Sequence, residues 1–308
     1  MGQYGVLVVD DSSFMRRCIS MIIEQDPDFF IIGIARNGQD AIEKVQRLKP
    51  DIVTMDVEMP EMDGIQALSE IMKHNPVPVI MLSNHTEEGA KTTIKALELG
   101  AVDFFLKSSI VGENASPQSV KQFLSSLKAI VENGKIPSFE NEAKVEEKGL
   151  NKLQDAKADI IVIGCSTGGP SALQSVLPRF PKDFHIPVVV IQHMPEGFTG
   201  PLAERFNTIC NLEVKEAENG ELIRPGTIYI APAGYQLYFI RNSDGNVMIN
   251  IDVNSPIETL YFPSVTVALM SAAQVFKNRM VTVIMTGMGN DGLAGCEEVK
   301  KYNGKVIV

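Results

Sequence analysis

The sequence predicts an α/β protein of two domains, the first of them a doubly wound parallel sheet. In the first hundred residues, short apolar runs alternate five times with stretches of helical periodicity. After a polar stretch, the second half opens with another apolar run that leads into glycines and a further helical pattern. A length of 308 residues is typical of about two domains.

The first domain is expected to begin with a buried strand at 6–9 and a helix at 13–25 whose apolar residues share one face. The expected elements that follow are a strand at 30–34, helix 38–48, strand 52–55, helix 64–73, strand 77–82, helix 88–99, strand 103–106 and helix 117–132. In such folds ligands bind at the carboxyl ends of the strands.

Polar side chains stand at those strand ends, namely Asp10, Asp11, Asp56, Ser83 and Lys107. Three converging carboxylates repel one another and are suited to hold a hard cation such as Mg²⁺. A carboxylate beside that cation could accept a phosphoryl group, whose charge an ammonium and a hydroxyl would stabilise. The alternative is that each is an ordinary strand-end residue, which would suffice for any one of them alone.

Four motifs give a wider resemblance: Val8-Val-Asp-Asp-Ser12, Met55-Asp-Val-Glu-Met-Pro-x-Met-Asp-Gly64, Met81-Leu-Ser83 and Gly100-Ala-Val-Asp-Phe-Phe-Leu-Lys107. Through them residues 4–132 resemble the receiver domain of bacterial two-component response regulators, which has a flavodoxin-like fold. The resemblance implies that Asp56 is phosphorylated by a histidine kinase. It also implies a Mg²⁺ site formed by Asp10, Asp11, Asp56 and the backbone carbonyl of Glu58.

The same resemblance implies a switch in which Ser83 and Phe104 reorient on phosphorylation, beside Lys107. The family usually follows its lysine with proline, often in a cis peptide, whereas Ser108 stands here. The resemblance therefore does not predict the shape of the loop that follows Lys107.

Residues 133–157 are expected to be a linker, because they are polar, alternate in charge and lack apolar anchors. The expected domains are thus 1–132 and 158–308.

The second domain opens with a β-branched run at 159–163 that enters Gly164-Cys-Ser166-Thr-Gly168, followed by Pro170 and a helical pattern. A strand, glycine turn and helix of this kind form a nucleophile elbow, which exposes the serine hydroxyl beside free N–H groups. The alternative is a phosphate-binding turn of the Rossmann type, which uses the same glycines.

Strand and helix alternate again after the elbow. The expected strands are 186–192, 212–217, 226–231 and 281–285, with a hairpin of 235–240 and 247–251. The expected helices are 199–208, 264–276 and 293–302.

A serine nucleophile needs a base and a group that orients the base. His193 and Asp291 each lie just beyond the carboxyl end of an expected strand, so Ser166, His193 and Asp291 are the most economical triad. Alternatively, His193 is a core histidine and Asp291 only caps the helix at 293. The order Ser, His, Asp differs from that of α/β-hydrolases. Backbone N–H groups after Ser166 and in the loop 287–289 are natural oxyanion donors.

Further motifs are Ile163-Gly-x-Ser-Thr-Gly-Gly169, Gln192-His-Met-Pro195, Gly197-Phe-Thr199, Pro263-Ser-Val265 and Met285-Thr-Gly-Met-Gly-x-Asp-Gly292. Through them residues 158–308 resemble the Rossmann-like catalytic domain of the chemotaxis protein-glutamate methylesterases, in which a receiver precedes this domain. The resemblance implies that Ser166, His193 and Asp291 are nucleophile, base and orienting group. It implies that Thr167 and Met288 contribute to the oxyanion site, and that the esterase uses no cofactor.

The implied substrate is the glutamyl methyl ester of chemoreceptor cytoplasmic domains, which is converted to glutamate and methanol during adaptation. Many relatives also deamidate receptor glutamine, and nothing in the elbow excludes this. The unphosphorylated receiver is expected to inhibit the catalytic domain, and a chemotaxis histidine kinase to supply the phosphoryl group.

Three departures from the family are visible. The family usually has the motif Ala-Pro-Gly-Gly-x-His, whereas this chain has Ala231-Pro-Ala-Gly-Tyr-Gln236 and so lacks the histidine. After Pro-Ser-Val the family often has Asp-Val-Leu-Phe, whereas this chain has Thr266-Val-Ala-Leu269. The chain stops at Val308, where the family usually continues, so we expect its C-terminal end to be shortened.

Composition and charge argue against some other classes of function. A net charge of −10 without a basic stripe disfavours nucleic-acid binding. No apolar run has the length of a membrane span and no signal peptide is visible, so we expect a cytoplasmic protein without membrane insertion. The rival function is a non-enzymatic response regulator whose second domain binds a partner through a degenerate site.

Overall fold

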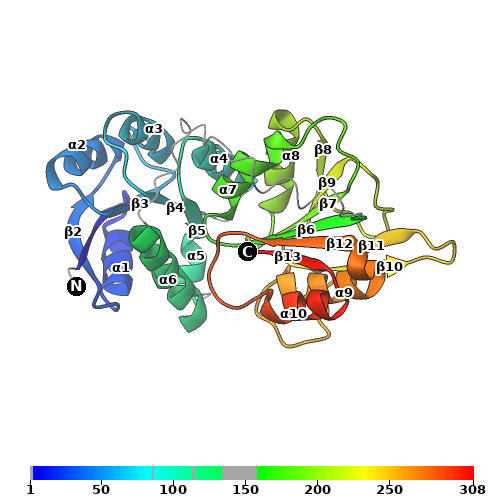
Figure 1. Cartoon of the computed structure of the whole chain (residues 1–308). Helices are drawn as coiled ribbons and strands as arrows, with labels where there is room; N and C mark the ends of the chain where they lie inside the picture. Colours follow the sequence, from blue (N-terminus) through cyan, green and yellow to red (C-terminus); the bar gives the residue numbers. More distant parts are fainter. Residues whose placement is uncertain (1–2, 85–86, 113–114, 134–157) are drawn as a thin grey trace. The chain divides into compact units, whose positions relative to one another are not determined.

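The computed structural model describes residues 3–84, 87–112, 115–133 and 158–308. Internal contacts divide the chain into two compact units, Met1–Phe139 and Glu140–Val308, which are coloured blue to green and green to red in Figure 1. The linker expected at 133–157 lies outside the described residues except for Asn133.

The first unit contains a five-stranded parallel sheet with the strand order β2-β1-β3-β4-β5. Its strands are β1 (Tyr4–Val9), β2 (Phe29–Ala35), β3 (Ile52–Asp56), β4 (Val79–Ser83) and β5 (Asp103–Leu106). This order places β1 and β3 side by side at the centre and confirms the predicted doubly wound sheet.

Helices cover both faces of this sheet (Figure 1). They are α1 (Ser13–Ile23), α2 (Gly38–Leu48), α3 (Gly64–His74), α4 (Glu87–Glu98), α5 (Lys107–Ile110) and α6 (Pro117–Asn133). The side chains of Ser12, Asn37 and Asp63 each accept the N–H of the third residue along and so begin α1, α2 and α3. Apolar residues of α1 and α6 form one cluster with alternate residues of β1, which explains the periodicity of these segments.

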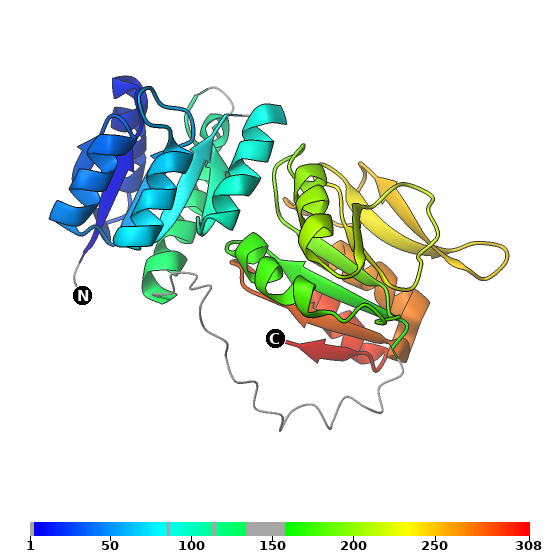
Figure 2. The same ribbon diagram turned by 90° about the horizontal axis from the view of Figure 1, so that it is seen from above.

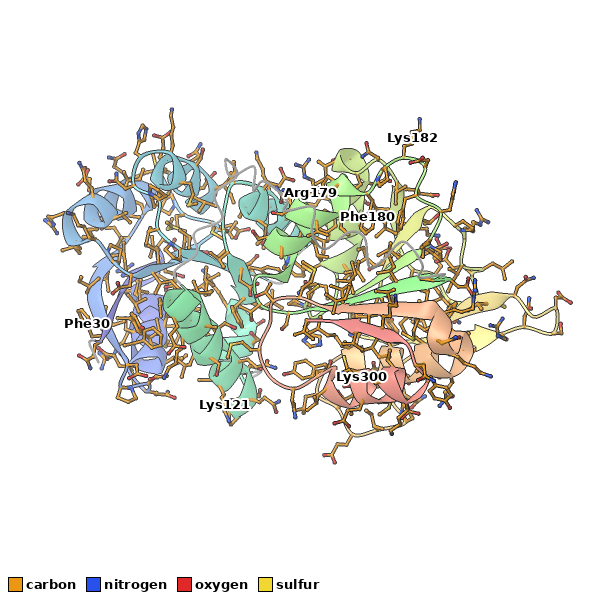
Figure 3. All side chains as sticks on the ribbon, viewed as in Figure 1. Phe30, Lys121, Arg179, Phe180, Lys182 and Lys300 are labelled. Carbon is orange, nitrogen blue, oxygen red and sulfur yellow. The ribbon has the colours of Figure 1, made fainter. Side chains whose placement is uncertain are left out.

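The elements of the first unit differ from the prediction by one or two residues at several ends and by one added helix. β4 begins at Val79 instead of residue 77, and Pro78, which has no N–H to donate, directly precedes it. The short helix α5 was not predicted and starts at Lys107 itself. At the edge of the sheet, Phe30 of β2 is 38% exposed (Figure 3).

The second unit contains a separate parallel sheet of six strands in the order β13-β12-β6-β7-β9-β8. Its strands are β6 (Ile160–Cys165), β7 (Val188–Gln192), β8 (Glu213–Glu216), β9 (Thr227–Ile230), β12 (Met280–Ile284) and β13 (Lys305–Ile307). β6 lies between β12 and β7, so the residue that follows β6 emerges at the middle of the carboxyl edge. The predicted Rossmann-like arrangement is confirmed.

The helices of this unit are α7 (Gly169–Val176), α8 (Thr199–Ile209), α9 (Val265–Phe276) and α10 (Leu293–Lys301), with short 3₁₀ turns η2 (Leu177–Arg179) and η3 (Lys277–Arg279). Helices α7 and α8 lie on one face of the sheet, and α9 and α10 lie on the other (Figures 1 and 2). β10 (Gln236–Arg241) and β11 (Val247–Asp252) form an antiparallel hairpin, which is a separate two-stranded sheet. None of the helices in the described ranges combines the length and apolar character needed to cross a membrane.

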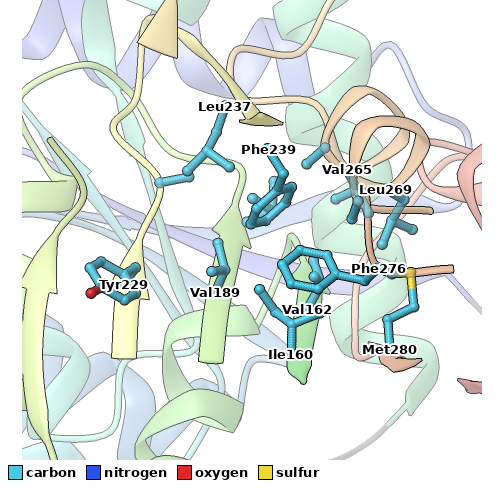
Figure 4. Close-up of a cluster of buried hydrophobic side chains, with 14 of the residues drawn as sticks. Ile160, Val162, Val189, Tyr229, Leu237, Phe239, Val265, Leu269, Phe276 and Met280 are labelled. Carbon is cyan, nitrogen blue, oxygen red and sulfur yellow. The ribbon is translucent and has the colours of Figure 1, made fainter. Parts of the chain in front are cut away.

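The core of the second unit joins α9, the sheet and the hairpin (Figure 4). Leu269 and Phe276 of α9 pack in one buried cluster with Val162 of β6 and Phe239 of β10. Phe239 and Phe276 meet edge to face, with ring centroids 5.6 Å apart. This packing holds α9 against the sheet and the hairpin.

Candidate functional site

Ser166 stands at the first position after β6, where the chain turns into α7. Gly168 makes the turn, with a φ of 72° in the region that favours glycine. The Ser166 N–H donates to the Thr286 carbonyl at 3.0 Å, and the Ser166 carbonyl accepts the Gly169 N–H at 2.7 Å. The strand, glycine turn and helix expected of an elbow are therefore all present, with a half-buried serine at the strand end.

Gln192 connects this turn to the neighbouring strand. Cys165 and Gln192 are the last paired residues of β6 and β7. The buried Gln192 amide donates to the carbonyls of Ser166 and His193, at 3.0 Å each. The His193 N–H in turn donates to the Cys165 carbonyl at 3.1 Å. Ser166 and His193 thus follow two adjacent parallel strands at the same sheet edge.

Gly169→Ala is expected to lower the free energy of unfolding of the second unit by about 1–3 kcal/mol. A Cβ at this position would lie 2.0 Å from Gln192 Oε1, so the buried amide would have to leave its two acceptors. Chemical denaturation measures the effect. The matched control is Gly200→Ala in α8, where a Cβ would meet only Glu216 at an ordinary 3.5 Å. Equal stability of both variants would contradict the expectation.

His193 and Asp291 are joined by a hydrogen bond of 2.8 Å between Nε2 and Oδ2. Asp291 also accepts the N–H groups of Val265 at 2.7 Å and Thr266 at 3.0 Å, and the hydroxyl of Ser264 at 2.8 Å. These donors belong to the start of α9, whose positive dipole end stabilises a carboxylate. Asp291 does not cap the helix at 293, because the N-cap residue of α10 is Gly292.

These contacts control the ionisation of Asp291. Burial alone raises the pKa of this carboxyl, but the hydrogen bonds from His193 and Thr266 outweigh burial and hold the pKa below its usual range. Asp291 is therefore an ionised acceptor, so the proton of the His193 ring that it binds belongs on Nε2.

The other ring nitrogen of His193 is left to accept a proton. Nδ1 is buried and makes no hydrogen bond to any residue in the described ranges. The imidazole lies flat against the ring of Tyr261, with centroids 4.1 Å apart and planes inclined by 11°. A neutral imidazole held in this way has the tautomer and orientation of a general base.

The hydrogen bonds of the described residues link His193 to Asp291 but do not include the Ser166 hydroxyl. The loop that contains Met288 adjoins the serine, because a Cβ on Gly287 would lie 2.8 Å from Ser166 Cβ. Thr286 Oγ1 donates to the Thr167 carbonyl at 3.1 Å. Thr167 and Met288 thus lie in two neighbouring loops, and their predicted part in an oxyanion site remains a prediction.

Several residues that surround the predicted triad could not be identified from the sequence. Gln192 and Ser264 lie within motifs that were noted, but no role was assigned to their side chains. Tyr261 gave no signal in the sequence, because its stacking on His193 depends on how a long loop returns to the sheet.

A second polar site occupies the carboxyl edge of the first sheet. Asp10, Asp11 and Asp56 each offer a carboxylate oxygen, and these oxygens lie within 4.8 Å of one another. Asp10 and Asp56 are buried and Asp11 is exposed. Lys107 Nζ lies 2.8 Å from Asp10 Oδ2 and 2.6 Å from Asp56 Oδ2. The structure therefore brings four of the predicted residues together.

Burial and neighbouring charges act in opposite directions here. Burial, with a smaller contribution from Asp10, raises the pKa of Asp56 to about 6 despite the nearby Lys107. For Lys107, burial acts to lower the pKa, but the two carboxylates outweigh it and raise the pKa above its usual value. Because Asp10 and Asp56 share one ammonium, the negative charge of the Asp56 carboxylate is only partly neutralised. A further cation would favour the ionised form of Asp56.

The residues present suit Mg²⁺, which prefers oxygen ligands and binds through one or two carboxylates. A hollow of about 430 Å³ lined by Asp11 and Glu58 adjoins the acidic cluster and offers access from solvent. The Glu58 carboxylate is not part of the cluster and accepts a hydrogen bond from Asn84 at 3.2 Å. This leaves its backbone carbonyl as the predicted ligand.

The two residues of the predicted switch are both buried. The Ser83 hydroxyl accepts a hydrogen bond from Thr93 of α4 at 3.0 Å and donates to the Asn84 carbonyl at 3.1 Å. Phe104 is paired with Met81 across β4 and β5. Their reorientation on phosphorylation remains a prediction.

Two family models match the chain. One described as "CheB methylesterase" matches residues 161–308, and one described as "Response regulator receiver domain" matches residues 6–113. The two matches fall within the two structural units.

Curated relatives match nearly the full chain. A "Protein-glutamate methylesterase/protein-glutamine glutaminase" from Halalkalibacterium halodurans is 45% identical over 96% of this chain and 85% of the relative. The protein of the same name from Thermotoga maritima is 42% identical over 98% and 87%. A solved structure, "Crystal structure of Thermotoga maritima CheB methylesterase catalytic domain", is 44% identical, covers 48% of this chain and 78% of that chain, and has a TM-score of 0.46.

Proposed function

This chain belongs to the CheB methylesterase family, and on that premise we propose that it is a serine esterase regulated by phosphorylation. Its substrates are glutamyl methyl esters on the cytoplasmic domains of chemoreceptors, and its products are glutamate and methanol. The protein acts in the cytoplasm during chemotactic adaptation.

The observation that carries the esterase proposal is the arrangement around Ser166. A serine on an elbow follows β6, and the adjacent strand presents a histidine whose Nε2 is bound to an ionised carboxylate and whose Nδ1 is unpaired among the described residues. A base in this state is what a serine hydroxyl needs in order to become a nucleophile.

In the proposed reaction, Ser166 Oγ attacks the ester carbonyl carbon while His193 Nδ1 takes the hydroxyl proton. Asp291 stabilises the imidazolium that forms. The tetrahedral intermediate collapses, the C–O bond to methanol breaks, and His193 returns the proton to the leaving oxygen. Water, activated by the same histidine, then hydrolyses the acyl-serine and releases glutamate.

The negative oxygen of the tetrahedral intermediate needs donors that are already in place. We assign this role to the backbone N–H groups of Thr167 and Met288, in the two loops that meet beside Ser166. The same site would deamidate receptor glutamine, with ammonia leaving in place of methanol, which agrees with the double name of the relatives.

A phosphonylating reagent specific for activated serines tests the nucleophile. Mass spectrometry is expected to find the label on Ser166, and His193→Ala is expected to prevent it. Labelling of a different serine would contradict the proposal.

The first domain is proposed to accept a phosphoryl group on Asp56 from a chemotaxis histidine kinase. Mg²⁺ would be held by Asp10, Asp11, Asp56 and the backbone carbonyl of Glu58, and when bound it supplies positive charge for the phosphoryl oxygens. Lys107 holds the Asp56 carboxylate in place, as its contact of 2.6 Å suggests.

Without phosphorylation the receiver restricts access to Ser166, and phosphorylation shifts the population towards the open arrangement through Ser83 and Phe104.

Asp56→Asn is expected to abolish the increase in ester hydrolysis on addition of acetyl phosphate and Mg²⁺, because an amide cannot accept the phosphoryl group. Rates with and without acetyl phosphate measure the effect. The control is Asp28→Asn, which removes a partly exposed ion pair with Lys128 in the same domain and should leave the stimulation intact. Stimulation of Asp56→Asn equal to that of the parent would exclude Asp56 as the regulatory site.

A further inference from the structure

Gln236 is a polar side chain at the first position of β10, and it is 0% exposed. A buried amide is unfavourable unless its donors and acceptor are paired, so its partners indicate what it does.

The two ends of this amide bind the two ends of one short segment. Nε2 donates to the carbonyl of Tyr261 at 2.7 Å, and Oε1 accepts the N–H of Ser264 at 2.9 Å. Because both bonds are to backbone atoms, Gln236 fixes the backbone of residues 261–264 and not only the rotamer of one side chain.

Each end of the segment 261–264 contacts a different member of the triad. The Tyr261 ring stacks on the imidazole of His193, with centroids 4.1 Å apart. The Ser264 hydroxyl donates to Asp291 Oδ1 at 2.8 Å, and the N–H of the residue after it donates to Asp291 Oδ2. The base and the carboxylate that orients it are therefore both supported by a segment that Gln236 holds.

We propose that Gln236 is a positioning residue for the His193–Asp291 pair. This inference rests on the proposed esterase function, and it assigns a task to a residue whose two hydrogen bonds go to the segment 261–264 and not to Ser166, His193 or Asp291. Without the amide, the Tyr261 carbonyl and the Ser264 N–H lose their buried partners and the segment must move to find others. A displacement of about 1 Å in a catalytic group can lower the rate by roughly 100-fold.

Gln236→Met is the central test, because methionine has nearly the same length but lacks the amide donors and acceptor. We expect kcat for ester hydrolysis to fall about 10- to 100-fold with little change in KM, since the side chain of Gln236 is fully buried. Gln236→His, whose neutral ring keeps one donor and one acceptor, should retain more activity than Gln236→Met.

Ser271→Ala is the matched control. The Ser271 hydroxyl accepts the N–H of Phe239 at 3.2 Å and so also joins α9 to β10, but away from the triad. It should keep the parent kcat. If Gln236 served only the general packing of α9 and β10, the two variants would have similar kinetics.

A readout that does not require turnover is the ¹H NMR resonance of the ring proton shared by His193 Nε2 and Asp291. The proposal predicts that this resonance shifts or broadens in Gln236→Met and stays in place in Ser271→Ala. A Gln236→Met protein with the parent kcat and the parent resonance would overturn the inference. An inactive parent with the predicted NMR difference would instead overturn the esterase proposal and leave the positioning role intact.

Discussion

Ser166→Ala is expected to lower kcat for methyl ester hydrolysis by roughly 10⁴- to 10⁶-fold, because the acyl-enzyme route is lost while substrate binding remains. The fold should be unaffected, since Ser166 is held through its backbone N–H and carbonyl and none of the hydrogen bonds of the described residues involves its hydroxyl. Initial rates on a methylated receptor fragment, together with thermal unfolding of the variant, measure the two effects.

The matched control for this change is Ser175→Ala. Ser175 is an exposed serine of α7, the helix that begins at the elbow, and its hydroxyl donates only to the Ser171 carbonyl at 3.3 Å. Its kcat should equal that of the parent. If Ser166→Ala hydrolysed the ester as fast as Ser175→Ala does, the nucleophile would have to be sought elsewhere.

Asp291→Asn is expected to lower kcat by about 10³- to 10⁴-fold, because the amide presents the wrong atoms to His193 Nε2 and favours the wrong tautomer. It should also lower the free energy of unfolding of the second unit by on the order of 2–4 kcal/mol at neutral pH, since the carboxylate accepts four hydrogen bonds. The Nδ2 group of asparagine would face donors at the start of α9.

The stability difference between Asp291→Asn and the parent has a defined pH dependence. The folded-state pKa of Asp291 lies below its unfolded value of about 4, so the folded state favours the ionised form. The stabilisation is fully present above the unfolded pKa and is lost as the pH falls through the folded pKa. The difference should therefore be constant near neutral pH and shrink below about pH 4.

Chemical denaturation of parent and variant at several pH values measures this dependence. The control is Asp159→Asn, which removes a partly exposed ion pair with Arg279 and should cost less than about 1 kcal/mol with full activity. A difference for Asp291→Asn that grew on acidification would contradict the sign of the pKa shift.

The sequence alone was enough to locate most elements and the edge at which each predicted site lies. The helix expected at 38–48 has those bounds, because Asn37 caps its start and its apolar residues share one face. Ser166 and His193 could each be placed at the carboxyl end of an expected strand, and they share one sheet edge because β6 and β7 pair in parallel.

The contacts that orient the candidate triad could not be predicted in this way. Asp291 accepts hydrogen bonds from the start of α9, some 25 residues earlier in the chain, and this depends on how α9 packs on the sheet. The stacking of Tyr261 on His193 and the two bonds of Gln236 are likewise tertiary contacts without a local pattern. The helix α5 was missed because four residues are too few to show helical periodicity.

Release of methanol from a methylated chemoreceptor fragment measures directly whether the phosphorylated receiver controls a serine esterase. The full chain is assayed alone, with Mg²⁺, and with Mg²⁺ and acetyl phosphate, beside Ser166→Ala and Asp56→Asn. We expect basal release by the parent, a higher rate with acetyl phosphate, no such rise in Asp56→Asn and only the residual rate of a roughly 10⁴- to 10⁶-fold slower enzyme in Ser166→Ala. A folded parent chain that releases no methanol under any of these conditions, or releases it at the same rate in all of them, would rule out a serine esterase controlled by phosphorylation.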